Sequence, residues 1–242
     1  MSMTSSSLLI WNLEYSKCCF QFNSLEGDDS TEFCASRFHP TLDYLLLAST
    51  IKGEVGVYDL REMSRGRHPT TTYHTHGSGT LNLETFYSSV DSRFCSDQRY
   101  IISRDCFNIK VWDRTMNERP LKNFPICEML SPQIQFATNR NLILDHFLLD
   151  NTPQGDFLVT GSYDGAFHNV DPQKDTNFRH CLNFTKDTIK HDMKSSESTQ
   201  IADNVNFGKK TLNIACNPAN NSIVVASNSN LHLYNFKKLK NE

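Results

Sequence analysis

Five short segments of the chain alternate apolar and polar side chains and run through a large or branched apolar residue into Asp or Asn. A period of two along the chain predicts β-strands, and Asp or Asn at the end of a strand favours a turn. The segments are residues 8–13, 55–60, 109–114, 167–171 and 231–236.

A second pattern precedes four of these segments. Each has an apolar run shortly before it, and a shorter segment before that run, which begins with Phe38, Phe94, Phe147 or Ile214. Each unit therefore predicts a strand a, a turn, a strand b, a turn and a strand c. The predicted b strands are residues 45–50, 100–105, 157–162 and 223–227.

This repeat predicts an all-β fold, the WD-repeat β-propeller, in which each blade is a four-stranded sheet. The aromatic or Val position of strand c recurs at residues 11, 58, 112, 170 and 234, so each unit is longer than a usual WD repeat and carries loop insertions. Residues 19–23 predict the first outer strand d. Helical periodicity is confined to two short stretches, residues 25–32 and 125–132.

We expect residues 1–242 to form a single, partial propeller of about four blades. The count is about seventeen strands. The expected boundaries are 7–24 for strands c and d of a first blade, 33–85, 89–140 and 142–185 for three blades, 186–204 for a polar loop, and 205–242 for a last blade without its closing strand.

Composition narrows the class of protein. Lys and Arg number 24 against 27 Asp and Glu, a net charge of −3, which argues against a nucleic-acid clamp with a basic face. No apolar run approaches the roughly 18 residues of a membrane span, and the first residues lack a basic secretory leader. These observations predict a cytoplasmic protein, with presence in the nucleus left open. The eight cysteines form no C-x-x-C pair and are expected as free thiols.

Each candidate catalytic motif lacks a residue that its chemistry requires. Arg104 and Asp105 resemble the start of a kinase catalytic loop, but Lys110 stands where that loop needs Asn. His74 and His76 have the spacing of metal ligands, yet no third ligand lies near them in the sequence. We therefore expect no enzymatic activity, no metal site and no cofactor.

Residues 100–121 carry a more specific pattern. They place Arg-Asp in the b–c turn, Val-Trp-Asp at the end of strand c, and Arg-Pro seven residues after the Trp. This block resembles the family of B-type regulatory subunits of protein phosphatase 2A. Further segments resemble that family in the same order along nearly the whole chain: residues 38–40, 52–53, 58–61, 160–167, 206–210 and 217–218.

The resemblance implies a non-catalytic protein that recruits phosphoprotein substrates and joins the phosphatase scaffold and catalytic subunits. Family members are about twice as long and form seven blades, so the chain is expected to correspond to their C-terminal part, without the hairpin arm that grips the scaffold. Two alternatives stay open: a WD-repeat interaction scaffold with no phosphatase partner, and a truncated relative without function.

The candidate binding residues come from the face on which the b–c turns open. The turns are expected to expose their side chains there, and the aromatic residues Phe107 and Tyr163 are the strongest candidates because aromatic side chains dominate interface energetics. The full set is Lys52, Arg104, Asp105, Phe107, Tyr163 and Asp164, with Asn228 in the last turn.

An acidic stretch on the first d–a connection adds Glu26, Asp28, Asp29 and Glu32. The resemblance implies that this element lines a substrate groove, where carboxylates attract the basic residues around a phosphosite. A plain solvated loop is an equal alternative. The chain departs from the family in having Arg37 in place of a Glu and Ser5–Ser7 in place of an Asp pair.

Five positions are expected to be structural. Trp11 and Trp112 are predicted core residues, and Asp59, Asp113 and Asp171 are predicted to bond backbone N–H groups in the turns after strand c.

Overall fold

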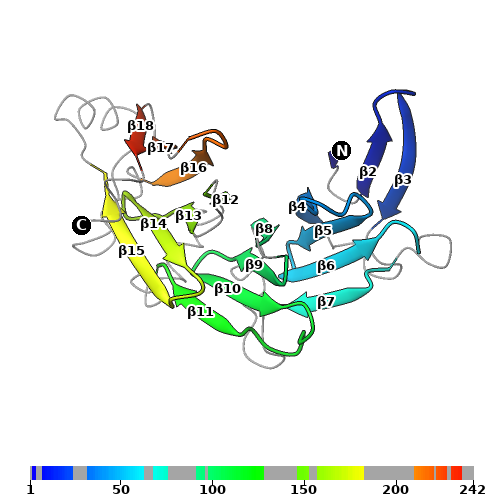
Figure 1. Cartoon of the computed structure of the whole chain (residues 1–242), viewed down its shortest axis with the longest axis horizontal. Helices are drawn as coiled ribbons and strands as arrows, with labels where there is room; N and C mark the ends of the chain where they lie inside the picture. Colours follow the sequence, from blue (N-terminus) through cyan, green and yellow to red (C-terminus); the bar gives the residue numbers. More distant parts are fainter. Residues whose placement is uncertain are drawn as a thin grey trace, which may run out of the picture. The chain divides into compact units, whose positions relative to one another are not determined.

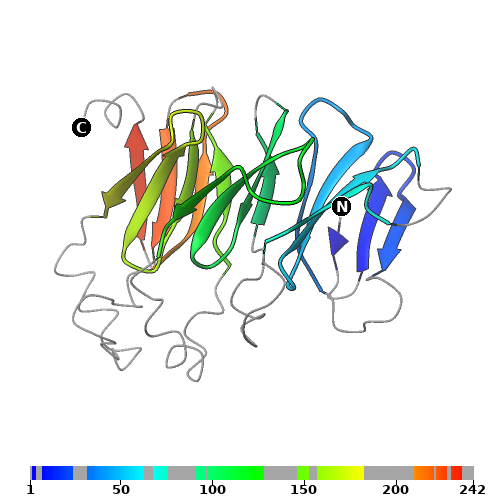
Figure 2. The ribbon, with the colours of Figure 1, turned by 90° about the horizontal axis from the view of Figure 1, so that it is seen from below.

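The computed structural model shows an all-β protein built from antiparallel sheets (Figures 1 and 2). It describes residues 2–3, 7–23, 32–62, 68–75, 91–95, 98–127, 146–152, 157–182, 210–220, 222–227 and 230–235. None of these residues is helical, and so none forms an apolar helix that could cross a membrane.

The strands form three four-stranded and two three-stranded sheets. The four-stranded sheets pair their strands in chain order, as the blades of a WD-repeat propeller do, so we name their strands a to d. The sheets are β1 (Ser2–Met3), β2 (Ser7–Asn12) and β3 (Lys17–Asn23); β4 (Phe33–Phe38), β5 (Leu45–Thr50), β6 (Glu54–Asp59) and β7 (Thr71–His74); β8 (Asp91–Phe94), β9 (Tyr100–Arg104), β10 (Asn108–Asp113) and β11 (Lys122–Pro125); β12 (Leu149–Asn151), β13 (Leu158–Gly161), β14 (Ala166–Asp171) and β15 (Thr176–Cys181); and β16 (Thr211–Cys216), β17 (Ser222–Ser227) and β18 (Asn230–Asn235).

The predicted fold class is confirmed. The five segments that alternate in the sequence form the third strands β6, β10 and β14 of the complete sheets, together with β2 and β18, and the four preceding apolar runs form β5, β9, β13 and β17. One strand was missed: β1 pairs with β2 through Ser2 and Leu9. Two residues are too few to show a period, which is why the sequence predicted no strand before residue 7.

The two helical stretches are not supported where the structure describes them. Lys122–Pro125 is strand β11, and residues 126 and 127 after it are not helical. The remainder, residues 128–132 and 25–31, lies outside the described residues, as does the predicted polar loop 186–204. The boundaries predicted for the blades stay predictions.

The chain divides into two compact units, and the sheet β8–β11 contributes residues to both. In the first unit, the core lies between β4–β7 and the inner strands of the next sheet, where β8 packs against β4 and β5. Trp112 is fully buried in this core and donates its indole N–H to the Ser103 hydroxyl at 2.9 Å, with Tyr73 5.6 Å away between ring centres. The predicted core role of Trp112 is confirmed.

The same prediction is wrong for Trp11, which is 43% exposed. Leu8 and Ile10 are the buried residues of β2, and the pairing of β2 with β3 shifts register between Ile10 and Trp11. Leu8 and Ile10 share the buried face of β2, so alternation alone places the Trp11 side chain on the opposite, exposed face, whereas β10 buries both of its faces.

The second unit has its own core, formed by β12–β18. Val159, Phe167 and Leu182 pack against Ile214, Ile223 and Val225 of the last sheet. The Thr211 hydroxyl accepts the Ser162 N–H at 2.8 Å and donates to the Ala166 carbonyl at 2.6 Å. These bonds fix strand β16 against the β13–β14 turn.

The three aspartates that end strands β6, β10 and β14 are structural, as predicted. Asp59 accepts the Arg61 N–H at 2.9 Å, Asp113 the Thr115 N–H at 2.9 Å, and Asp171 the N–H groups of Gln173 and Lys174 at 3.0 Å. Each carboxylate also pairs with a base: Arg61 at 2.6 Å, Arg99 at 2.8 Å and Lys174 at 3.3 Å, respectively.

All eight cysteines are free thiols, and Cys95, Cys106 and Cys127 are buried. Cys34 is partly buried, and its burial, together with the charge of Glu32, raises the pKa of its thiol to about 12. This thiol is protonated, and hence a poor nucleophile, at neutral pH.

The Gly161→Ala substitution is expected to lower the free energy of unfolding by about 3 kcal/mol or more. A Cβ at residue 161 would overlap the Thr211 carbonyl oxygen and lie 2.6 Å from its Oγ1, and a backbone atom cannot rotate away. Urea unfolding measures the change. Gly56→Ala is the control, because the nearest neighbours of its Cβ are side-chain atoms, of Tyr58 at 2.9 Å and Pro69 at 3.1 Å, and the overlap is smaller. Equal losses for both variants would contradict the assignment.

Stability is expected to fall in acid through Asp113. Hydrogen bonds from the Thr115 N–H and hydroxyl, and then from Arg99, lower the pKa of its carboxyl from 3.8 to about 2. The native state therefore binds fewer protons than the unfolded state, and this stabilisation is present above about pH 4 and lost towards pH 2.

The measurement is the urea midpoint as a function of pH for the wild type and Asp113→Asn. The variant should lose less stability than the wild type over this range. Asp175→Asn is the control, since the Asp175 side chain is 68% exposed. Parallel curves for the wild type and Asp113→Asn would refute the role of this carboxyl.

Candidate functional site

Three b–c turns are described, and each joins the two central strands of a four-stranded sheet. They are residues 51–53, 105–107 and 162–165. Gly53 and Gly165 have φ values of 78° and 71°, in the left-handed region that a residue with a Cβ rarely enters. These glycines allow the tight reversals at two of the turns. Asn228 of the last turn lies outside the described residues.

The expectation that these turns expose their side chains is wrong for most of them. Arg104, Asp105, Phe107 and Tyr163 are all buried. The residues after β11 cover the second turn, because the N–H groups of Ile126 and Cys127 donate to the Phe107 carbonyl. Tyr163 packs edge-on against Phe147, with 4.7 Å between ring centres. The two aromatic candidates are core residues in this structure.

The remaining two candidates, Lys52 and Asp164, are residues of intermediate burial with different surroundings. Lys52 is half-buried in the first turn. The Asp164 carboxylate is buried and accepts bonds from the Ser162 hydroxyl and the Ala166 N–H. Arg179 binds the other carboxylate oxygen of Asp164, with Nε at 2.7 Å and Nη2 at 2.6 Å. Asp164 thus closes its turn, and Lys52 is the candidate of this set that is left partly accessible.

A chain of hydrogen bonds joins the first two turns. Thr75, just after β7, donates its N–H and hydroxyl to the Gly53 carbonyl at 2.9 and 2.7 Å. The Lys110 ammonium donates to the Thr75 carbonyl at 2.8 Å and to the Asp105 carboxylate at 2.7 Å. The Lys110 and Asp105 side chains are 10% and 1% exposed, so this ion pair is largely withdrawn from water. The two turns are therefore fixed to one another.

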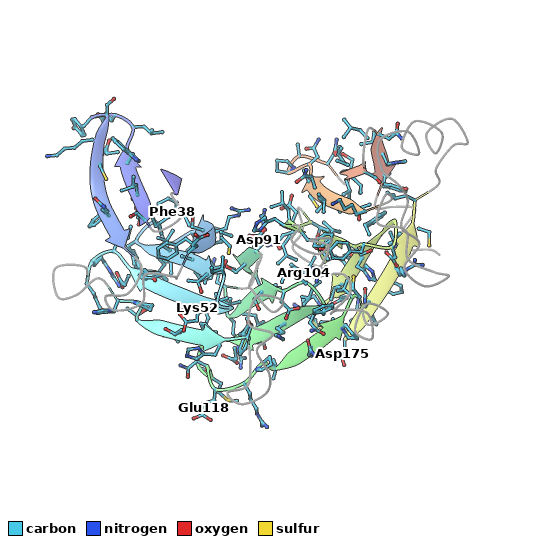
Figure 3. All side chains as sticks on the ribbon, turned by 180° about the vertical axis from the view of Figure 1, so that it is seen from behind. Phe38, Lys52, Asp91, Arg104, Glu118 and Asp175 are labelled. Carbon is cyan, nitrogen blue, oxygen red and sulfur yellow. The ribbon has the colours of Figure 1, made fainter. Side chains whose placement is uncertain are left out.

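The buried guanidinium of Arg104 extends this polar cluster. Its Nη1 donates to the Asp105 carbonyl. Asp91, equally buried, is its directly opposite neighbour across β8 and β9, and both residues are labelled in Figure 3. The Asp91 carboxylate also meets Arg37 Nη2 at 3.4 Å. The sequence pattern singles out Arg37, Arg104 and Asp105 separately, but it misses Asp91 and Thr75, which nothing in the local pattern marks.

The acidic connection is described only at its end. Glu26, Asp28 and Asp29 lie outside the described residues. Glu32 is exposed, and its carbonyl accepts the Ile51 N–H at 2.8 Å. The Glu32 backbone is therefore fixed beside the b–c turn that carries Lys52.

The described residues contain no group of three or more His, Cys, Asp or Glu side chains arranged to hold a metal ion. His74 lies 3.6 Å from a Glu54 carboxylate oxygen, and His76 lies outside the described residues.

Known proteins resemble this chain along nearly its whole length. It is 28% identical over 247 residues to the serine/threonine-protein phosphatase 2A regulatory subunit phr2AB of Dictyostelium discoideum, a match that covers 93% of this chain and 51% of that protein. It is 27% identical over 253 residues to the B alpha isoform of the 55 kDa regulatory subunit of protein phosphatase 2A from Oryza sativa subsp. japonica, covering 93% and 44%. The 55 kDa regulatory subunit of Drosophila melanogaster is 26% identical over 250 residues, covering 94% and 49%.

The resemblance to the B-type regulatory subunits of phosphatase 2A is confirmed by these matches. No family model matches the sequence. The chain spans about half the length of the curated relatives it matches.

The Lys110→Met substitution is expected to cost about 3 to 5 kcal/mol of unfolding free energy, because it leaves the Asp105 carboxylate buried without its counter-charge. Lys174→Met is the control, since the Lys174 side chain is 75% exposed and an exposed pair contributes at most about 1 kcal/mol. Chemical unfolding of the two variants tests this difference, and similar, small losses would show that the buried pair does not hold the turns.

Proposed function

We propose that this protein is a non-catalytic regulatory subunit of a phosphatase of the 2A type. The observation that carries the proposal is the similarity of 93% of the chain to proteins named as regulatory subunits of that phosphatase. In this proposal the protein joins the scaffold and catalytic subunits in the cytoplasm and brings phosphoprotein substrates to the catalytic subunit. It binds neither nucleic acid nor membranes, and it needs no cofactor.

The proposed substrate surface is the end of the sheets where the b–c turns lie. Glu32 is fixed there beside the turn of Lys52, and Glu26, Asp28 and Asp29 precede it in the sequence. A run of carboxylates attracts the basic residues that flank a phosphosite and raises the association rate. These side chains are the proposed contacts with substrate.

The buried candidates have a supporting role in this proposal. Arg104, Asp105, Phe107, Tyr163 and Asp164 set the shapes of the turns without reaching solvent to any large extent. Rigid turns lower the entropy cost of binding, because the surface is already ordered before the substrate arrives.

A regulatory protein of this kind accelerates dephosphorylation without chemistry of its own. It holds the phosphoprotein near the active site of the catalytic subunit, which raises the effective concentration of the phosphosite there. Specificity then follows from which proteins the turn surface retains.

One observation favours a second candidate function, a WD-repeat scaffold that binds other partners. Arg37 stands where the resemblance leads us to expect Glu, and its side chain is 36% exposed while it pairs with Asp91. A cation at this place reduces the attraction for basic substrates. In this alternative the protein binds neither the scaffold subunit nor the catalytic subunit of the phosphatase.

Co-purification tests the two candidates. The tagged full chain is mixed with purified phosphatase scaffold and catalytic subunits at low salt, and a ternary complex is expected by size-exclusion chromatography. Folded protein that elutes free of both subunits would favour the scaffold function instead.

Within the complex, exchanging Glu26, Asp28, Asp29 and Glu32 for Lys tests the substrate surface. The expected result is about tenfold slower dephosphorylation of a phosphopeptide with basic flanks, because several favourable charge contacts become repulsive. Hydrolysis of para-nitrophenyl phosphate, which has no flanking residues, should be unchanged. Equal effects on both substrates would argue against a docking role for this segment.

A further inference from the structure

We propose that a groove at the other end of two sheets, where the a–b and c–d turns of β4–β7 and β8–β11 lie, binds an acidic peptide segment of a partner protein. The groove has a volume of about 570 Å³ and lies within the first unit. It is separate from the b–c turns of the proposed substrate surface. The residues that carry the inference are Leu42, Tyr44, Arg61, Glu62, Arg99 and Arg114.

Two arginines of the groove are exposed, whereas the aspartates that they bind are buried. Arg61 and Arg99 have side chains that are 63% and 64% exposed, whereas the aspartates that they bind, Asp59 and Asp113, are 10% and 9% exposed. The carboxylates face inward because they accept the N–H groups of their own turns. A partner that approaches this end therefore meets guanidinium groups first.

Arg114 supplies a third cation. Its Nη1 donates to the Gln98 carbonyl at 3.0 Å, and its guanidinium lies 5.8 Å from the centre of the Phe94 ring. Within the described part of the chain it has no carboxylate partner. A guanidinium in this state forms strong, charge-assisted hydrogen bonds with an incoming carboxylate.

The lining residues also provide an apolar surface between the charges. Leu42 and Tyr44 are partly buried and pack on the core, and the Arg61 guanidinium lies 3.6 Å over the centre of the Tyr44 ring. An isolated inorganic anion would use only the cations. A peptide that carries carboxylates on either side of an apolar or aromatic residue matches both parts of the groove, and this is the occupant that we propose.

Glu62 opposes this charge pattern. It is the exposed carboxylate among the lining residues, and it lies beside Arg61 in the turn after β6. Its removal is therefore expected to strengthen the binding of an acidic segment, while the removal of Arg114 weakens it. The two opposite effects give the proposal two independent tests.

The probe is a fluorescein-labelled peptide with glutamates on both sides of a tyrosine, and the control probe has glutamines in their place. Fluorescence anisotropy with the full chain measures the affinity. The acidic probe is expected to bind, the glutamine probe is not, and the affinity should fall as salt is raised because the contacts are exposed charges.

Arg114→Gln is expected to weaken binding about tenfold, the loss that corresponds to one charge-assisted contact. Glu62→Gln is expected to strengthen binding about twofold to threefold. The matched controls are Arg119→Gln and Glu118→Gln, which are exposed on the β10–β11 connection outside the groove, where Figure 3 shows Glu118 pointing away from the sheets.

Several results would overturn the proposal. These are no binding of the acidic probe by the wild type, equal binding of the two probes, or equal losses for Arg114→Gln and Arg119→Gln. Should Arg114→Gln fail to fold, judged by its thermal melt, the comparison of Glu62→Gln with Glu118→Gln decides instead. Because the probe binds without any other phosphatase component present, the outcome is independent of the proposed regulatory role.

Discussion

The fold depends on burial of the third strand of each complete sheet along both of its faces. After its first residue β6 is buried throughout, β10 shows the same pattern, and β14 is buried from end to end. Strand β18 occupies the corresponding place in a three-stranded sheet and alternates between half-buried and exposed residues, with Leu231 and Leu233 largely exposed. A strand buried on both faces has no water available to its polar groups, so each charge near it needs a partner inside the protein. Lys110 and Asp105 meet this requirement as an ion pair, and the Arg104 guanidinium donates to the Asp105 carbonyl. Through Thr75, the same ion pair links the first two b–c turns.

That coupling links the fold to the proposed function. The side chains that shape the turns are interior, and the groups left for a partner, Glu32 and Lys52, sit at the margin of a rigid network. Binding specificity can therefore change through a few marginal residues while the support stays constant. The groove at the other end follows the same division, since the aspartates of the c–d turns are buried and their arginine partners lie outside.

The sequence predicted the strands well because their signals are local. Alternation and a final Asp lie within six residues, and they placed β6, β10 and β14 correctly.

Burial was harder to predict, because it depends on residues distant in the chain. Trp11 and Trp112 share one position of the repeat, yet β2 buries only the face opposite Trp11, while β10 buries both of its faces. Phe107 and Tyr163 are turn residues by every local sign, and Ile126 and Phe147 lie against them only after folding. The contacts of Lys110 with Thr75 and of Arg37 with Asp91 join residues 35 and 54 positions apart, which no spacing rule connects.

The aspartate turns have an evolutionary consequence. In each, the carboxylate is held by N–H groups of the residues that follow it, so the contact depends on the backbone of those residues and not on their side chains. The base that neutralises it comes from a different place each time: two residues later for Asp59, from the preceding a–b turn for Asp113, and three residues later for Asp171. The aspartate thus keeps one position at the end of the strand, whereas its cationic partner comes from a different position in each sheet. Successive repeats can drift apart in charge and in sequence while keeping one turn geometry, so the surface around these turns can acquire new partners without any change in the way the chain folds.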